Sequence, residues 1–161
     1  MGCWNVILKD KSPCALIISR NSSPLLKESK PYLVENGAYI VKKEMGRLDA
    51  IIIATGTEVN MAVGISNELE LNGINIRVVS MPSKEVFESM NDEYKEEILP
   101  RGYRTIVIEY GVSADWYKYV RSDNYLININ NFGKSGTKEE ILEYYELDYD
   151  SVKNYIIELL K

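Results

Sequence analysis

The sequence predicts an α/β fold in which helices cover both faces of a mixed, mainly parallel sheet of about five strands, one of them antiparallel. Residues 48–80 have the pattern of a strand, a helix and a second strand, which requires a crossover between parallel strands. Two further apolar strands follow this unit. The strand before it is too close for a crossover helix, so that strand should be antiparallel.

The unit at 48–80 is the centre of this three-layer prediction. Ala50 to Ala54 includes three consecutive isoleucines, which is typical of a strand covered on both faces. Beyond Thr55-Gly56-Thr57 the apolar residues recur with helical spacing. This helical stripe consists of Val59, Ala62, Val63, Ser66 and Leu69. Gly73 ends the helix, because glycine accepts the left-handed conformation there, and Ile74 to Ser80 forms the second strand.

The segments before this unit have weaker patterns. A short helix is expected at Trp4 to Asp10 and a strand at Cys14 to Ser19, with a turn between them. Asn21 to Pro31 is polar, has no periodicity and is interpreted as a linker. A strand at Ala38 to Val41 follows the Asn36-Gly37 turn and should be the antiparallel strand, at a sheet edge or its junction.

The segments after the unit complete the layers. Buried strands are expected at 105–109 and, as the last strand, at 125–130. The predicted helices lie at 84–99 with a break near Asn91-Asp92, at 116–120, at 138–145 and from about 151 to 160. Thr137 and Glu140 have the spacing of a capping box at the start of the third of these helices.

The composition excludes several classes of function. The chain has 161 residues, of which 45% are hydrophobic, and is long enough to bury a sizeable core as one globular body. Its net charge of -5 argues against nucleic-acid binding, which needs clustered Lys and Arg. No apolar run approaches the roughly 20 residues that span a bilayer, and no signal peptide is evident. We therefore expect a cytoplasmic protein without membrane contact.

The chain contains no histidine. This excludes Ser-His and Cys-His nucleophile pairs and removes the commonest metal ligand. The cysteines, Cys3 and Cys14, lack the spacing of a metal or redox site, and Cys14 is interpreted as a small buried hydrophobe. Any chemistry near this chain should therefore rest mainly on other residues or on another polypeptide.

Two loops could bind an anion. Thr55-Gly56-Thr57 lies between a strand and a helix, where free backbone N–H groups can hold an anion. The segment lacks the spacing of a phosphate-binding motif, and a simple N-cap by Thr57 is the favoured interpretation. The loop from Phe132 to Gly136 has the same two interpretations.

Other candidates also have a structural alternative. Glu109, at the end of a buried strand, is a tuned carboxylate or a side chain bonded to the backbone of its turn. Trp116, Tyr117 and Tyr119 stack on a ligand, meet a partner subunit or are buried within the domain. Arg20 follows an apolar strand, where open α/β sheets place ligands, but from the residues alone an exposed arginine that opens a loop is the favoured interpretation.

Four segments together resemble the transketolases in order and spacing. They are Ala15-Leu16-Ile17-Ile18-Ser19-Arg20, Ile53-Ala54-Thr55-Gly56-Thr57-Glu58-Val59, Arg77-Val78-Val79-Ser80-Met81-Pro82-Ser83, and Glu109-Tyr110-Gly111-Val112 with Trp116-Tyr117-Lys118-Tyr119-Val120. The resemblance implies that residues 30–161 are a C-terminal domain with a transketolase C-terminal domain-like fold. Residues 1–29 would be the last helix and strand of the preceding pyrimidine-binding domain with a linker.

The resemblance also implies a function for the parent protein. Transketolases of the pentose phosphate pathway transfer a two-carbon ketol unit between sugar phosphates and use thiamine diphosphate with a divalent metal, Mg or Ca. In that family these groups are bound by the pyrimidine- and diphosphate-binding domains, and the enzyme is a homodimer. This chain would therefore bind no cofactor, contribute no catalytic residue and be inactive alone.

One functional residue carries over from the family. The resemblance assigns to Arg20 the contact with the phosphate of the sugar substrate, a task that suits a permanently charged, forked donor. Two positions depart from the family pattern. Asn21 replaces the usual glutamine, and Thr137 replaces the proline that follows the Phe132-Gly133-Lys134-Ser135-Gly136 loop.

Two alternatives from other functional classes remain open. The first is a stand-alone regulatory domain that binds a small anionic ligand at the carboxyl ends of its strands, near Gly56, Ser83, Gly111 and Gly133. The second is a subunit-interaction module whose aromatic helix docks onto a partner.

Overall fold

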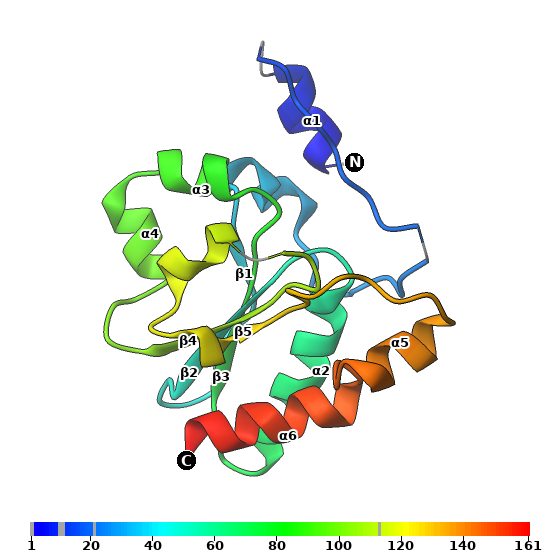
Figure 1. The fold of residues 1–161 in the computed structure, drawn as a ribbon. Coiled ribbons are helices and arrows are strands. Elements are labelled where there is room, and N and C mark those ends of the chain that lie inside the picture. The colour runs from blue at the N-terminus through cyan, green and yellow to red at the C-terminus, as the bar shows by residue number, and fades with distance from the viewer. Residues whose placement is uncertain (1, 10–11, 21, 113) are drawn as a thin grey trace.

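The sheet has five strands and is mixed, as the sequence predicts. The computed structural model describes residues 2–9, 12–20, 22–112 and 114–161. Its strands are β1 (Tyr39–Lys42), β2 (Ala50–Ala54), β3 (Ile76–Ser80), β4 (Arg104–Ile108) and β5 (Leu126–Ile127), in the order β1-β3-β2-β4-β5. β2 pairs in parallel with β3 and β4, and β5 in parallel with β4. β1 is antiparallel to β3 and lies at a sheet edge, so the predicted fold class is confirmed (Figure 1).

The helices follow the predicted positions closely. The α-helices are α1 (Gly2–Lys9), α2 (Glu58–Leu71), α3 (Lys84–Ser89), α4 (Asp92–Ile98), α5 (Lys138–Tyr144) and α6 (Tyr149–Leu160). Short 3-10 helices occur as η1 (Pro31–Asn36), η2 (Ala114–Tyr119) and η3 (Asp123–Tyr125). The break near Asn91 is confirmed, because the Asn91 side chain accepts from Tyr94 N and starts α4. The capping box of Thr137 and Glu140 is also confirmed.

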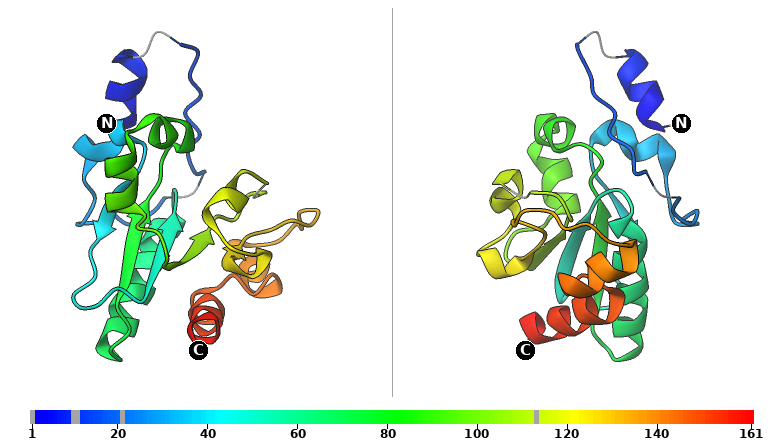
Figure 2. Two further views of the ribbon diagram at one scale, coloured as in Figure 1. Left: turned by 90° about the vertical axis from the view of Figure 1, so that its left-hand side faces the viewer. Right: turned by 45° about the vertical axis from the view of Figure 1, so that its right-hand side comes forward.

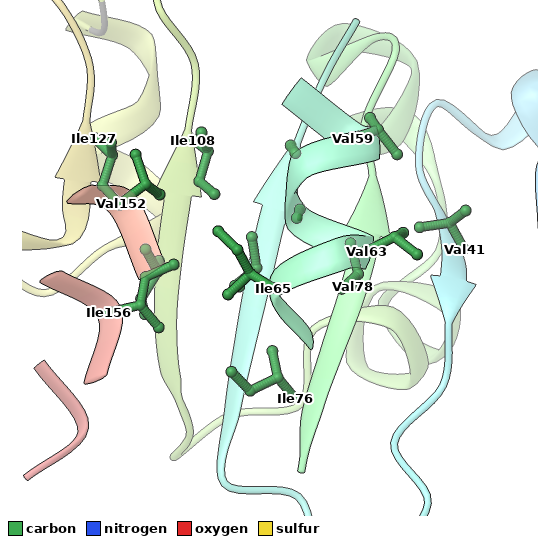
Figure 3. Close-up of a cluster of buried hydrophobic side chains, with 14 of the residues drawn as sticks. Val41, Val59, Val63, Ile65, Ile76, Val78, Ile108, Ile127, Val152 and Ile156 are labelled. Atoms are coloured by element: carbon green, nitrogen blue, oxygen red, sulfur yellow. The ribbon is translucent and has the colours of Figure 1, made fainter. Parts of the chain in front are cut away.

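Alternate residues of the central strands serve two cores, one on each face of the sheet. On β2, Ile52 packs against α2 and α6, whereas Ile51 and Ile53 pack against the opposite layer. Figure 3 shows the first core, with Val63 and Ile65 of α2 and with Val152 and Ile156 of α6. The second core contains Phe87 of α3, Ile98 of α4 and Trp116 of η2. This burial on both faces explains why β2 is a continuous apolar run.

The central strands end at the same level. Ala54, the last residue of β2, pairs with Ser80 of β3 and with Ile108 of β4. The turns that follow these parallel strands therefore lie along one edge, here called the carboxyl edge of the sheet. In α2, the buried Ser66 hydroxyl donates to Ile76 O at 2.9 Å and joins the helix to the start of β3.

The N-terminal segment extends away from the sheet. α1 lies beside η1 and makes an exposed ion pair with it, Lys9 Nζ to Glu35 Oε2 at 3.3 Å (Figures 1 and 2). The predicted helix end at Asp10 and the first linker residue, Asn21, lie outside the described residues. The described part of the linker runs from 22 to 30 and reaches the carboxyl edge, where it contacts α2.

Two sequence predictions about strands need correction. The segment 14–19 forms no strand within the described chain, and Ile17 and Ile18 are 93% and 79% exposed, because no neighbouring strand pairs with it. Cys14 is exposed rather than buried for the same reason. The last strand is only Leu126–Ile127 instead of 125–130, and beyond it Asn128 and Asn130 hydrogen-bond to each other through their side chains.

Candidate functional site

A hollow of about 330 Å³ lies at the carboxyl edge of the sheet, between the strand ends and the linker. Thr55, Gly56, Ser80 and Pro82 form its floor after β2 and β3, and Val59 and Asn60 belong to the first turn of α2. The linker residues Ser23, Pro24, Leu25, Leu26 and Ser29 close its other side. This is the place at which open α/β sheets commonly hold ligands.

The turn that opens α2 differs from its prediction. Gly56 has a positive φ of 57°, which explains a glycine at this position. Thr57 stands directly before α2, but its side chain does not accept from the helix, so the predicted side-chain cap is wrong. Its hydroxyl instead donates to Glu58 Oε1 at 2.7 Å. Thr57 has helical backbone angles, φ of -72° and ψ of -25°, instead of the extended conformation that lets an N-cap oxygen accept from the first-turn N–H groups.

Glu58 gives the carboxyl edge negative charge. Burial raises the pKa of its carboxyl group, and the like charge of nearby Glu109 raises it further, while the hydrogen bond from Thr57 and the charge of Lys138 lower it. A fixed carboxylate beside the start of α2 opposes the attraction that the helix dipole exerts on an anion. The sequence interpretation of Thr55-Gly56-Thr57 as an anion site is therefore weakened, and Glu58 is a residue that it missed.

The four positions proposed for a regulatory ligand do not share a cavity. Only Gly56 lines the hollow. Ser83 instead caps α3, since its Oγ accepts from Val86 N at 3.3 Å. Gly111 N donates to Glu109 Oε1 at 2.9 Å, which is the structural alternative predicted for Glu109. Gly133 lies in an exposed loop, and no atom lies within 4 Å of the position that a Cβ would take there.

The aromatic helix packs mainly into its own domain. Trp116 is 4% exposed, its ring lies 5.8 Å from that of Tyr119, and Lys84 Nζ lies 4.5 Å from its centre. Tyr119 donates from its hydroxyl to Glu88 Oε1 at 2.6 Å. Tyr117 is 46% exposed. Of the three aromatic residues, Tyr117 therefore offers the most surface to a partner.

The loop from Phe132 to Gly136 is held on α5. The Tyr145 hydroxyl donates to Phe132 O at 2.9 Å, and Lys134 Nζ lies 3.4 Å from the centre of the Tyr144 ring. The Phe132 side chain is 99% exposed. Both the backbone and the lysine of this loop thus have partners within the chain.

Arg20 stands at the other end of the linker from the sheet. It is exposed, and it makes no ion pair or side-chain hydrogen bond with any described residue. The linker contacts α2 three positions after Arg20, at Ser23. The Asn60 Nδ2 of α2 donates to Ser23 Oγ at 2.8 Å and to Pro24 O at 3.3 Å. Asn60 is not a member of the apolar stripe of α2, and its contact with the linker is visible only in the tertiary structure.

The donor set does not fit a metal centre. The chain has no histidine, and its described residues contain no group of three or more Cys, Asp or Glu side chains that could hold a metal ion. No helix in the described ranges is long and apolar enough to cross a membrane.

A second hollow, of about 390 Å³, lies between β5 and α6 beside Tyr145 and Tyr155, where no motif was predicted.

The fold and the positions of these segments agree with comparisons to known proteins. Residues 37–148 match the family described as the transketolase-like TK C-terminal domain. The chain belongs to this family. It is 41% identical over 160 residues to the transketolase of Aquifex aeolicus (strain VF5), covering 96% of this chain and 23% of that protein. It is likewise 41% identical to a probable transketolase of Streptococcus pneumoniae, covering 86% and 21%.

Solved transketolases share the fold. A transketolase mutant from Pichia stipitis in complex with fructose 6-phosphate has a TM-score of 0.79 and 31% identity, covering 88% of this chain and 20% of that chain. The transketolase of Leishmania mexicana has a TM-score of 0.75 and 30% identity, covering 83% and 19%. The chain spans only 21% to 24% of the length of the curated relatives that it matches.

Proposed function

We propose that this chain is the C-terminal domain of a transketolase. The parent enzyme transfers a two-carbon ketol unit between sugar phosphates, as a cytoplasmic homodimer of the pentose phosphate pathway. Its thiamine diphosphate and divalent metal are held by the pyrimidine- and diphosphate-binding domains. Residues 30–161 form the C-terminal domain, and residues 1–29 belong to the preceding domain and the linker. The observation that carries the proposal is the similarity to the Aquifex aeolicus transketolase over 96% of this chain, which extends beyond residues 37–148.

The exposed N-terminal segment supports the same assignment. Leu16, Ile17 and Ile18 form an apolar run without a strand partner among the described residues, and a run of this kind is stable when it pairs with another sheet. We infer that the sheet of the pyrimidine-binding domain supplies that partner. Arg20 then emerges at the carboxyl end of the completed strand, where a substrate would be bound.

Arg20 is proposed to bind the phosphate of the sugar substrate. A guanidinium carries a permanent charge and can donate two parallel hydrogen bonds to phosphate oxygens. Its freedom from ion pairs with the described residues leaves this donor set available. The domain itself contributes no group that would break or form a carbon–carbon bond, so its role is to support the other domains and to hold Arg20.

The alternative of a stand-alone regulatory domain has weaker support. The hollow beside Gly56 is large enough for a small ligand, but the neighbouring Glu58 and Glu109 disfavour an anion. The alternative of an interaction module also loses support, because Trp116 is buried in its own domain.

The proposed function is tested by substituting Arg20 in the parent enzyme. Arg20→Ala should lower kcat/KM for phosphorylated sugars by about 10- to 100-fold, since a charge-assisted hydrogen bond contributes roughly 1.5–3 kcal/mol. Unphosphorylated sugars should be converted at the unchanged rate. Arg47→Ala is the matched control, because Arg47 is exposed and lies before β2, at the opposite edge of the sheet. Equal losses for both classes of sugar would contradict the phosphate contact.

A further inference from the structure

Asn60 binds the linker close to Arg20. Its side-chain amide donates to Ser23 Oγ at 2.8 Å and to Pro24 O at 3.3 Å. Among the described residues, the next contacts of the linker with the domain come later in the chain. Leu26 packs against the first core, and the Tyr39 hydroxyl forms hydrogen bonds with Ser29 Oγ and Lys30 N, each at 3.5 Å. Among residues 22–31 of the linker, Asn60 therefore makes the first contact with the sheet domain that follows Arg20.

The linker is held here by hydrogen bonds rather than by packing. Ser23 and Pro24 are exposed, Leu25 is 92% exposed, and the hollow of about 330 Å³ lies between this stretch and the sheet. An exposed chain above a hollow has few apolar contacts that could fix its position. Two hydrogen bonds from one rigid helix can do so, because the Asn60 backbone belongs to the first turn of α2.

In the proposed parent enzyme the strand at 14–19 holds Arg20 on one side, and on its other side the length of chain to the first tie sets how far the loop can move. With Ser23 fixed, Arg20 is three positions from its anchor, which allows a reach of about 10 Å. Without that tie the next anchor is Leu26, which packs against the first core six positions from Arg20, and the reach grows to about 20 Å. Pro24 adds stiffness, because proline fixes its own φ and restricts the residue before it to extended conformations.

We propose that Asn60 is a positioning residue for substrate binding: it fixes the linker so that Arg20 is held at the phosphate of the sugar. This inference rests on the proposed function, since it needs Arg20 to bind that phosphate. Asn60 touches neither substrate nor cofactor and acts only through Ser23 and Pro24. Through this contact, the C-terminal domain sets the affinity of a site that it does not itself contain.

The test uses the parent enzyme with Asn60→Leu. Leucine has nearly the shape of asparagine and a better helix propensity, so α2 is preserved while both hydrogen bonds are lost. We expect KM for phosphorylated sugars to rise about 3- to 10-fold, with kcat within about 2-fold and unphosphorylated sugars unaffected. Asn67→Leu, at an exposed position of the same helix, should leave all these values unchanged.

Two further variants separate positioning from folding. Asn60→Asp should give an intermediate KM, because the Ser23 hydroxyl can turn and donate to the carboxylate while the bond to Pro24 O is lost. Ser23→Ala combined with Asn60→Leu should be no worse than Asn60→Leu alone, since the two residues share one contact. Additive effects of Ser23→Ala and Asn60→Leu would overturn the proposed contact.

The 161-residue chain provides a readout that is independent of catalysis. Trypsin should cleave after Arg20 and Lys27 about 3- to 10-fold faster in Asn60→Leu than in the unchanged chain, because the linker opens more often. Suppose that Arg20→Ala selectively lowers kcat/KM for phosphorylated sugars while Asn60→Leu leaves their KM unchanged. The inference about Asn60 is then wrong and the proposed function stands. If Arg20→Ala has no selective effect, the proposed function fails and the inference fails with it.

Discussion

Arg77 of β3 and Glu44, in the connection between β1 and β2, form a two-point ion pair. Arg77 Nε donates to Glu44 Oε2 at 2.9 Å, and Nη2 donates to Glu44 Oε1 at 2.6 Å. Each side chain is only 10% exposed. The remaining nitrogen of Arg77, Nη1, donates to the carbonyl oxygens of Glu97 and Ile98 at 2.7 and 3.2 Å. One guanidinium thus joins the β1–β2 connection to the end of α4.

Glu44→Ala should destabilise the chain strongly. Removing the carboxylate leaves a buried guanidinium without its charge partner, a change that lowers the free energy of unfolding by about 3–5 kcal/mol. Glu35→Ala is the control, because Glu35 and Lys9 are 58% and 73% exposed and such pairs contribute about 0–1 kcal/mol. Urea unfolding followed by circular dichroism measures both. Similar losses of unfolding free energy in the two variants would contradict the expectation that the buried ion pair contributes more than the exposed one.

The ion pair between Arg77 and Glu44 should make the free energy of unfolding depend on pH in the acid range. The hydrogen bond from Arg77 lowers the pKa of Glu44 from its ordinary value of 4.5, despite an opposing effect of burial. The unfolded state therefore binds a proton at higher pH than the folded state does. The contribution of Glu44 is complete above about pH 4.5 and is lost as pH falls through its folded pKa. Glu44→Gln should remove this part of the slope when unfolding is measured from pH 7 to pH 3.

Glu58 should have the opposite dependence. Burial raises the pKa of this carboxyl group above its ordinary value of 4.5, so the folded state holds the proton more tightly. Its contribution is most favourable below pH 4.5 and falls as pH rises through the folded pKa. Glu58→Gln keeps an acceptor for the Thr57 hydroxyl and should stabilise the chain at pH 7. Urea midpoints at pH 7 and pH 4 test this, and a midpoint lowered at pH 7 would contradict it.

Two glycines with similar backbone angles should respond differently to alanine. Gly37 has φ of 76°, and an added Cβ would lie 2.2 Å from Phe87 N and 2.6 Å from Ser83 O. Gly73 has φ of 80°, but nothing lies within 4 Å of its Cβ position. Gly73→Ala should therefore cost about 1 kcal/mol from backbone strain alone. Gly37→Ala adds a clash with backbone atoms and should cost more than about 3 kcal/mol, measured by thermal unfolding.

The 161-residue chain on its own should not transfer ketol groups. It lacks histidine, and its described residues form no cluster of metal-binding side chains. An assay with ketose and aldose phosphates, thiamine diphosphate and magnesium should show no product above the level of a sample without protein. Product formation by a preparation free of host enzyme would contradict the role of a supporting domain.

Local pattern was sufficient for most of the fold. The continuous apolar run of β2 indicates a strand buried on both faces, the 3.6-residue period of the apolar stripe indicates α2, and the steric freedom of Gly73 marks the end of that helix. The antiparallel direction of β1 followed from the short connection to β2. Burial on both faces predicted the helix layers, because a sheet with two apolar faces must be covered twice.

Local pattern failed at residues 14–19 and at Thr57. Cys14 and the run that follows it have the composition of a buried strand, yet within the described chain they form no strand, because strand pairing needs a second strand. Thr57 is a residue type that often caps helices, yet its helical backbone angles keep its oxygen from the first-turn N–H groups, and its hydroxyl donates to Glu58 instead. Neither outcome is encoded in the spacing of neighbouring residues.

The sequence by itself determined the α/β class, the direction of the first strand, the positions of most helices and the resemblance from which a phosphate contact is predicted for Arg20. The tertiary structure alone decided the strand order, the union of Arg77 with Glu44 across 33 positions, and the contact of Asn60 with the linker across 37. The physical reason is the distance along the chain over which each kind of information acts. Periodicity reports which face of an element is buried, whereas partners far apart in the chain meet only when the whole sheet is assembled.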